Sequence, residues 1–364
     1  MSGQIPEVKL VFDEPVQRKK APKHLADFSP TERKAFAKEL GFEPFRATQV
    51  ATHYFSHLSS NPEEWTDIPA GERQVIADAL TPQMIKLVTT RTTDNGMTRK
   101  DLWKLHDGVL VESVLMRYTD RVTVCISSQA GCGMNCPFCA TGQAGLTRNL
   151  SAGEIFDQVN YLKRFAEQNY DTPLTNIVYM GMGEPLLNYA NVLKSVEMIT
   201  SPDGLGMASR RITVSTAGIA KMIKKLGDDQ VKFNLALSLH AANDTKRNQI
   251  MPINESNTLE ALSEALRYFY DKTENEITLE YIMFNKFNDT VDDARELYEF
   301  ARKLPCKINI IEYNPIAQAD FVNAEADALA KFVAYLESKK MIVNVRRSRG
   351  KDIDAACGQL AGKK

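Results

Sequence analysis

The sequence predicts an α/β fold in which a small N-terminal helical domain precedes a partial (βα)6 TIM-like barrel. Two observations predict it. From residue 121 onwards, short runs of apolar, β-branched residues alternate six times with amphipathic helical runs, which is typical of a parallel sheet covered by helices. Before residue 89 the patterning is mainly helical. A length of 364 residues accommodates both a small and a large domain.

The first 120 residues divide into three parts. Residues 1–25 contain three prolines and a basic run, and are expected to form a flexible tail. Ser29 then provides a helix N-cap with Pro30 in the first turn, which begins a helical domain predicted over residues 26–88. Residues 89–120 contain the turn sequences DNG and HDG beside an alternating run, and therefore predict a β-hairpin linker.

The barrel is predicted over residues 121–347. Ser151 and Glu154 form a capping box at the start of a helix predicted over 151–168. The segment 348–364 follows the barrel, and its residues 348–357 are expected to be mobile. The predicted strands are 122–127, 176–180, 212–215, 233–239, 277–283 and 308–313, with 342–345 as a candidate edge strand.

The composition is that of an ordinary globular protein, with 43% hydrophobic residues, 25% charged residues and a net charge of −1. This charge gives no global sign of a nucleic-acid partner, and small basic clusters at 18–20, 209–211 and 346–351 are interpreted as solvated surface unless they converge on a cleft. No run approaches the about 20 apolar residues that span a bilayer. The N-terminus does not resemble a secretory signal, so we expect a cytoplasmic protein without a membrane partner.

Half of the six cysteines lie within eight residues. The sequence CGMNCPFC at 132–139 contains Cys132, Cys136 and Cys139. In the cytoplasm such a cluster binds metal or catalyses more often than it forms disulfides. Three thiolates would hold a 4Fe–4S cluster with one iron open to an external ligand. Two alternatives stay open here: a zinc site, although no second Cys-x-x-Cys motif lies nearby, and buried, unreactive thiols.

Five of the six predicted barrel strands end in polar or cysteine-containing sequences. Ligands of parallel barrels bind at the C-terminal ends of the strands, so we expect these groups to line one mouth. Taken alone, each of these groups is also explained by polar side chains that form hydrogen bonds with nearby backbone groups. Along the chain the groups are the cysteine run, residues 181–185, Ser215, the three residues Ser238, Leu239 and His240, and Asn314.

The spacing Cys-x-x-x-Cys-x-x-Cys after the first barrel strand, with Phe138 before the last cysteine, resembles the radical S-adenosylmethionine (SAM) superfamily. The resemblance implies a barrel of radical SAM type. It also implies a 4Fe–4S cluster that binds SAM at its free iron and cleaves it to a 5′-deoxyadenosyl radical. Residues 181–185 are similar to the motif that meets the methionyl ammonium in this superfamily, and a carboxylate at Glu184 suits that cation.

More specific sequences resemble the RlmN family within this superfamily. The resemblance covers about residues 26–362 and implies a methyltransferase with dual specificity, acting on C2 of adenosine in 23S rRNA and in tRNA. By pattern alone, Cys125 would be a core strand residue and Cys357 an incidental thiol. The matching sequences are 129–132, 140–143, 180–187, 238–240 and 347–360, together with these two cysteines.

The resemblance implies a role for three residues. Cys357 accepts a methyl group from a first SAM, which suits a thiolate nucleophile. A second SAM supplies the radical that activates this methyl group for addition to adenine C2, which is too electron-poor for polar methyl transfer. Glu112 matches the proton acceptor, although an alternating strand alone predicts a solvated glutamate there. Cys125 then attacks the Cys357 sulfur, which releases the RNA and leaves a Cys125–Cys357 disulfide.

The same matching supplies the remaining contacts and partners. We expect a reducing electron donor such as flavodoxin, and a monomer. The helical domain is interpreted as an accessory RNA-binding domain, because basic residues that could contact phosphates are interleaved with aromatic ones. Two other functions stay open: methylation of adenosine C8 in rRNA, and RNA binding by a non-enzymatic zinc protein. The implied SAM contacts are Gly183, Glu184, Ser215, Ser238, Leu239, His240 and Asn314, and the basic residues are Arg33, Lys34, Lys38 and Arg46.

Overall fold

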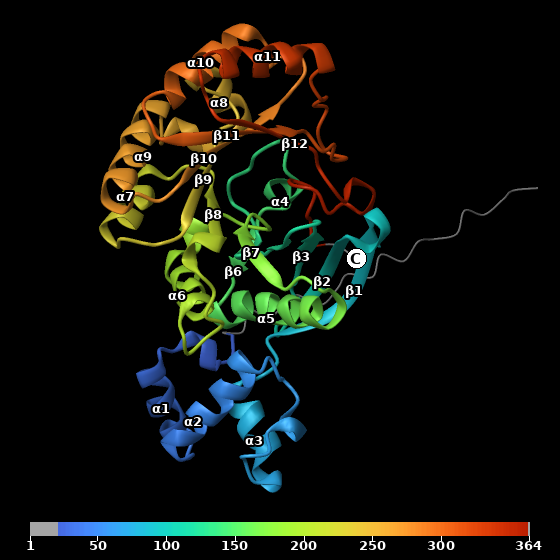
Figure 1. The fold of residues 1–364 in the computed structure, drawn as a ribbon, viewed down its shortest axis with the longest axis vertical. Helices are drawn as coiled ribbons and strands as arrows, with labels where there is room; N and C mark the ends of the chain where they lie inside the picture. The colour runs from blue at the N-terminus through green and yellow to red at the C-terminus, as the bar shows by residue number, and fades with distance from the viewer. Residues whose placement is uncertain (1–20, 363–364) are drawn as a thin grey trace, which may run out of the picture.

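The computed structural model describes residues 21–362, and within them it contains a ten-stranded sheet flanked by helices (Figure 1). The strand order is β1-β2-β3-β4-β7-β8-β9-β10-β11-β12. Neighbouring strands from β4 to β12 are parallel, and those from β1 to β4 are antiparallel. Because β1 and β12 are the two edges, the barrel is open. This confirms the predicted α/β partial barrel with a preceding helical domain.

The parallel strands coincide with the predicted ones to within two residues at each end. Their residues are mainly apolar or β-branched, as in parallel strands that are covered on both faces. In β10, for example, every side chain is buried. The strands are β4 (Val122–Cys125), β7 (Leu174–Tyr179), β8 (Ile212–Thr216), β9 (Asn234–Ser238), β10 (Ile277–Met283), β11 (Cys306–Glu312) and β12 (Val343–Arg346).

Helices follow the barrel strands and arc around the outside of the sheet (Figure 1). The predicted capping box is present, because Ser151 Oγ accepts from Glu154 N at 3.1 Å and the Glu154 carboxylate accepts from Ser151 N at 2.9 Å. No helix among residues 21–362 has the length and apolar character of a membrane span. The helices are α5 (Ala152–Asn169), α6 (Tyr189–Thr200), α7 (Ala220–Asp228), α8 (Asp244–Ile250), α9 (Leu259–Thr273), α10 (Val291–Ala301) and α11 (Ala326–Ser338).

Three antiparallel strands extend the sheet where a hairpin linker was predicted. They are β1 (Ile85–Thr93), β2 (Thr98–Leu105) and β3 (Leu110–Arg117). The prediction of helix up to residue 88 was wrong for the start of β1. A register shift between Leu87 and Thr89 interrupts the alternation of this strand, which explains why its pattern did not predict a strand.

The N-terminal domain consists of α1 (Pro30–Glu39), α2 (Pro44–Ala51), a π-helical turn (Thr52–Ser56) and α3 (Ala70–Leu80). In Figure 1 these helices lie beside α5 and α6, away from α4 (Ala140–Gln143). Residues 1–20 of the predicted tail lie outside the described residues.

The last residues of the predicted tail are packed. His24 and Leu25 are buried, and His24 Nδ1 accepts from Ala26 N at 3.0 Å. The chain is therefore anchored to the fold before the first helix begins.

The C-terminal segment is fixed after β12, although the sequence predicted mobility around 348–357. Arg349 donates to the Arg117 carbonyl at 2.8 Å, and Thr93 Oγ1 donates to Asp352 at 2.6 Å. Gly350, with a φ of +70°, forms a tight turn in which its carbonyl accepts from Ala355 N at 2.8 Å. Contacts distant in sequence thus order a segment whose own composition favours flexibility.

Candidate active site

The three clustered cysteines lie on the loop after β4. A two-stranded sheet, β5 (Gln129–Gly131) and β6 (Leu146–Asn149), braces this loop. Cys139 is the N-cap of α4, and Cys132 and Cys136 are buried. Burial raises the pKa of Cys132 to about 12 and also raises the pKa of Cys136, and the charges of the three thiols act on one another.

This donor set fits an iron–sulfur cluster. Burial favours the protonated thiols, whereas iron binds thiolates and compensates their charge. Three cysteines on one loop are a donor set that such a cluster could take, since iron–sulfur clusters are held by cysteine thiolates. Within residues 21–362, no three His, Cys, Asp or Glu side chains are gathered for a single metal ion.

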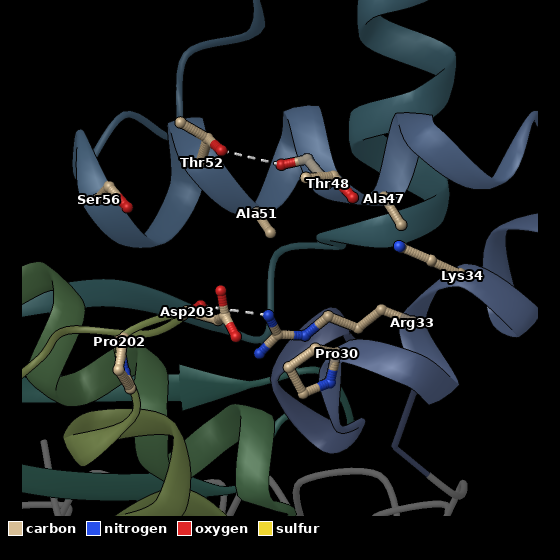
Figure 2. A pocket seen from close by; sticks show the side chains of 10 residues that line it. All are labelled: Pro30, Arg33, Lys34, Ala47, Thr48, Ala51, Thr52, Ser56, Pro202 and Asp203. Carbon is tan, nitrogen blue, oxygen red and sulfur yellow. Dashed lines mark hydrogen bonds between the residues drawn. The ribbon is translucent and has the colours of Figure 1, made fainter.

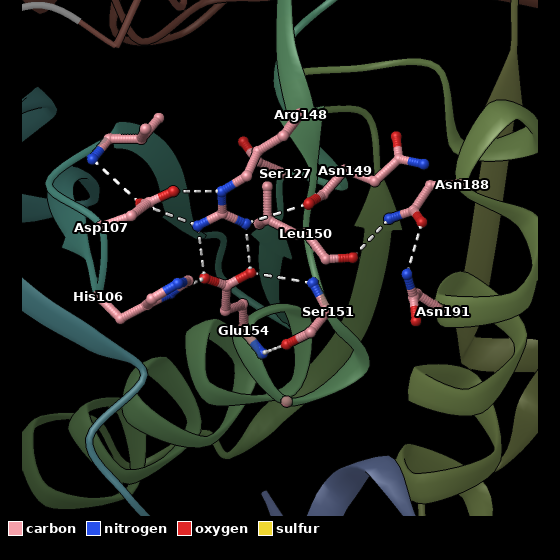
Figure 3. A network of polar contacts seen from close by, with 12 residues as sticks. His106, Asp107, Ser127, Arg148, Asn149, Leu150, Ser151, Glu154, Asn188 and Asn191 are labelled. Carbon is pink, nitrogen blue, oxygen red and sulfur yellow. Dashed lines mark hydrogen bonds and ion pairs between the residues drawn. The ribbon is translucent and has the colours of Figure 1, made fainter. Parts of the chain in front are cut away.

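A network of partly and fully buried polar side chains supports the two-stranded sheet (Figure 3). Arg148 on β6 donates to Asp107 at 2.6 Å and to Glu154 at 2.8 Å. His106 contacts the same Glu154 carboxylate at 3.0 Å. The network joins the turn after β2 to β6 and to the start of α5, so the strand behind the cysteine loop is fixed on two sides.

Gln129 extends this support to the loop after β7. Its side chain donates to Asn149 Oδ1 at 2.7 Å and accepts from Glu184 N at 2.8 Å. Gly183 packs against the same side chain, because a Cβ at Gly183 would lie 2.5 Å from Gln129 Cβ. The φ of Gly183 is +108°, a value that favours glycine. The conformation of residues 181–185 therefore requires a glycine at this position.

Glu184 is buried and oriented by backbone amides. Its Oε2 accepts from Ala217 N at 2.7 Å and its Oε1 from Leu186 N at 3.0 Å. Burial raises the pKa of this carboxyl group. The Thr216 side chain also bonds this carboxylate. A carboxylate has about four lone-pair sites, so it keeps capacity for a further donor such as an ammonium group.

The ends of β8 and β9 lie side by side. Ser215 Oγ and Ser238 Oγ are 3.4 Å apart. The amides of Leu239 and His240 both donate to the Glu280 carbonyl, at 3.0 and 3.2 Å. The structure thus brings four of the predicted SAM contacts to one edge of the sheet.

His240 connects this edge to the cysteine loop. Its ring packs edge-to-face on Phe138 with the centroids 5.1 Å apart, and its φ is +56°. Burial, followed by the charge of Arg247, lowers the pKa of His240 to about 3. The neutral Nδ1 accepts from Ile282 N at 3.2 Å. His240 is therefore an uncharged side chain at the C-terminal ends of the barrel strands.

Arg247 holds the ends of the same strands in place. The sequence analysis did not single out this residue. Its fully buried guanidinium donates to the carbonyls of Leu239, Ala217 and Ser238 at 3.0, 2.6 and 3.1 Å, and to Asn254 Oδ1 at 2.7 Å. Arginine in an amphipathic helix is usually solvated, so its sequence carried no signal of this role.

Asn314 and Cys357 meet above β11. Asn314 Nδ2 donates to the Cys357 carbonyl at 3.0 Å, whereas its buried Oδ1 has no hydrogen-bond partner among residues 21–362. The Gly358 carbonyl accepts from Ala140 N at 2.7 Å, which attaches the segment to the helix after Cys139. The Cys357 side chain keeps exposed surface, and burial of the sulfur, followed by the Glu280 charge, raises its pKa to about 11.

Cys125 and Glu112 lie in the same region. Burial, followed by the charge of Cys357, raises the pKa of Cys125, and both thiols are free. Glu112 is buried, so the solvated position that its strand pattern predicted was wrong. Its carboxylate pairs with Lys100 at 3.0 Å and accepts from the Ala361 and Gly362 amides.

The predicted phosphate-contacting residues divide into two kinds. Arg33 is buried and donates to the Asp203 carbonyl at 3.2 Å, so its expected phosphate contact was wrong (Figure 2). It lines a cleft of about 300 Å³ between the helical domain and the loop after α6. Lys34 and Lys38 are exposed, and the Arg46 guanidinium lies over the exposed Phe45 ring at 5.0 Å.

Comparison with known proteins identifies the family. Residues 126–301 match the Radical SAM superfamily. A probable dual-specificity RNA methyltransferase RlmN of Cytophaga hutchinsonii is 53% identical over 93% of both chains, and one of Nocardioides sp. is 46% identical over 97% of this chain and 96% of its own. The chain belongs to the RlmN family. A radical SAM methyltransferase from Sphaerobacter thermophilus has a closely similar crystal structure, with a TM-score of 0.90, 37% identity and coverage of 94% of this chain and all of that one.

Membership of the RlmN family establishes a radical SAM RNA methyltransferase. It implies an iron–sulfur cluster and SAM as cofactors and RNA as the substrate. The sequence analysis did not identify three buried charged residues near the C-terminal ends of the strands: Arg247, Lys100 and Glu280. Their neighbours come from distant parts of the chain, which no local pattern reports.

Proposed function

We propose that this RlmN family member methylates C2 of adenosine in 23S rRNA and in tRNA. The observation that carries the proposal is the position of Cys357, whose loop is hydrogen-bonded both to the cysteine loop at Ala140 and to the end of β11 at Asn314. A methyl carrier in this family must reach both the cluster site and the RNA base, and a loop docked across the mouth meets that requirement.

The cofactors proposed are a 4Fe–4S cluster on Cys132, Cys136 and Cys139, and two SAM molecules per turnover. When bound, they supply a 5′-deoxyadenosyl radical that abstracts hydrogen from a methyl group. Glu184, already oriented by two amides, would accept from the methionyl ammonium. Asn314 Oδ1, which has no hydrogen-bond partner in the described part of the chain, offers a further acceptor at the same mouth.

The residues of the chain carry the methyl group and release the product. The Cys357 thiolate forms an S–CH3 bond as the sulfonium–methyl bond of the first SAM breaks, leaving S-adenosylhomocysteine. After the activated CH2 carbon has joined adenine C2, the adduct would lose one electron, with the oxidised cluster as acceptor, and Glu112 takes the C2 proton. The Cys125 thiolate then attacks the Cys357 sulfur, so that an S–S bond forms as the bond from sulfur to the transferred carbon breaks, and that carbon takes up a proton to complete the methyl group. The charge of Cys357 acts on Cys125, and both cysteines are free, which supports this pairing.

The remaining partners belong to the same proposal. A target adenine must leave its stack to reach a barrel mouth, which favours loops and incompletely folded RNA. The exposed Lys34, Lys38 and the stacked Phe45–Arg46 pair are the candidate RNA contacts of the helical domain. Flavodoxin-type reduction, a monomeric state and action in the cytoplasm complete the proposal.

Mass spectrometry of nucleosides from RNA treated with cluster-loaded, anaerobic protein tests this function. We expect methyl groups on C2 of adenosine in both rRNA and tRNA. A Cys357→Ala variant should cleave SAM at the wild-type rate and methylate no RNA. Methylation at C8, or full activity of Cys357→Ala, would overturn the proposal, and one zinc with no iron in the purified protein would remove the radical chemistry altogether.

A further inference from the structure

A buried ion pair contacts the C-terminal segment on both sides of Cys357. Lys100 on β2 and Glu112 on β3 are both buried, with Nζ and Oε1 3.0 Å apart. Lys100 Nζ also donates to the Asp354 carbonyl at 3.1 Å. On the other side of the loop, Glu112 Oε2 accepts from Ala361 N at 2.8 Å and from Gly362 N at 3.0 Å.

The segment packs closely enough for these bonds to set its position. Gly362 has a φ of +63°, and a Cβ there would lie 2.7 Å from the Leu110 carbonyl oxygen. Thr141 Oγ1 donates to the Leu360 carbonyl at 2.6 Å, which joins this end of the segment to the helix after the cysteine loop. Residues 355–360 therefore form a loop with both ends fixed.

The ion pair and the segment depend on each other energetically. A buried pair is favourable only where further hydrogen bonds satisfy its remaining donors and acceptors. Here the segment supplies them: one carbonyl for the ammonium group and two amides for the carboxylate. In return, the pair forms hydrogen bonds with three backbone groups of the segment. Without the pair, these groups would be removed from water and have no hydrogen-bond partner.

We propose that the Lys100–Glu112 pair is a clamp that fixes the Cys357 loop over the mouth, with Lys100 as a positioning residue for methyl transfer. The clamp deepens the proposed function, and the part that concerns methyl transfer rests on it. Lys100 Nζ contacts the carboxylate of Glu112, the proposed proton acceptor, and the Asp354 carbonyl. It acts on methyl transfer through these two groups, by orienting the carboxylate and the loop that carries Cys357.

The rate of Cys357 alkylation tests the clamp without any methylation assay. Cluster-loaded, reduced protein is treated with iodoacetamide, and modification of Cys357 is followed by peptide mass spectrometry. In the docked loop both ends of the segment around the thiol are held by hydrogen bonds, so the movement of the sulfur toward the reagent is restricted. Lys100→Met should release the loop and accelerate alkylation about tenfold or more. Lys100→Arg should restore much of the slow rate, because it keeps the charge and a donor.

Lys104→Met is the matched control, because Lys104 lies on the same strand and is exposed. Its alkylation rate should equal that of the wild type. If Lys100→Met fails to fold, Gly362→Ala perturbs the clamp from the segment side and should give the same acceleration. A folded Lys100→Met or Gly362→Ala variant with the wild-type rate would overturn the clamp, as would an equal acceleration in Lys104→Met.

A second measurement connects the clamp to the chemistry. With RNA present, Lys100→Met should form 5′-deoxyadenosine at the wild-type rate while the ratio of 5′-deoxyadenosine to methylated RNA rises about tenfold. An unchanged ratio would refute the positioning role. If the wild type itself methylates no RNA, the proposed function fails, whereas the alkylation result still decides whether the clamp exists.

Discussion

Replacement of Gly183 by alanine should weaken SAM binding by displacing the loop after β7. Gly183 has a φ of +108°, and an added Cβ would lie 2.5 Å from Gln129 Cβ and 2.8 Å from Gln129 N. Gln129 cannot move aside freely, because its side chain bonds both Asn149 and Glu184 N. The extra methyl group therefore displaces the backbone that carries the Glu184 carboxylate.

The size of the effect follows from two contributions. A non-glycine residue at positive φ costs about 1–2 kcal/mol, and overpacking in a well-packed region costs about 1–3 kcal/mol. If the loop moves to relieve the overlap, SAM binding must return it to its original position. Most of the cost is then subtracted from the free energy of SAM binding. With about 1.4 kcal/mol for each factor of ten, a cost of about 3 kcal/mol weakens SAM binding about 100-fold.

Equilibrium dialysis of SAM against cluster-loaded, anaerobic protein measures this change. Gly206→Ala is the matched control, because Gly206 also has a positive φ, +61°, but a Cβ there meets no atom within 4 Å. It should keep the wild-type affinity and lose only about 1 kcal/mol of unfolding free energy. A Gly183→Ala variant that binds SAM within about threefold of the wild type would refute the argument, because the overlap would then have no consequence at the site.

Two further variants address stability. Gly71→Ala, in the exposed first turn of α3 with open space around it, should raise the free energy of unfolding by about 0.5 kcal/mol in urea titrations, and a decrease would contradict this. Burial, followed by the charge of Arg33, lowers the pKa of His24 to about 3. Between pH 3 and 6.5 the unfolded chain therefore binds more protons than the folded one, and the free energy of unfolding falls as the pH falls.

His24→Asn keeps an acceptor for Ala26 N but does not titrate. Between pH 7.5 and 5 the wild type should therefore lose about 2 kcal/mol more unfolding free energy than the variant, and equal losses in both proteins would refute this.

The sequence predicted the barrel well because its signals are local. The parallel strands are short runs rich in apolar and β-branched residues, and α5 begins at a complete capping box. The antiparallel strands were harder to predict, because the register shift between Leu87 and Thr89 interrupts the period of two by which strands are recognised.

Long-range contacts account for what the sequence could not predict. The segment after β12 is rich in glycine and charge, yet Glu112, Lys100 and Asn314 hold it in place from strands more than 40 residues away. The burial of Glu112 has the same origin, because its carboxylate bonds Lys100 and the amides of Ala361 and Gly362. Arg33 illustrates the converse, since a basic residue among aromatics proved to be a buried link between two domains.

Glu184 has both a structural and a functional interpretation, and the two rest on the same hydrogen bonds. Its two bonds to Leu186 N and Ala217 N satisfy backbone groups of β8 and of the loop after β7, as an ordinary turn carboxylate would. The same bonds prevent the carboxylate from rotating, although burial raises its pKa and so disfavours the charged form. A cationic amine entering the mouth would reverse that preference, because it offsets the buried negative charge at the remaining lone pairs. The cost of keeping Glu184 buried is therefore recovered when a positively charged ligand binds, which favours cationic over neutral ligands at this mouth.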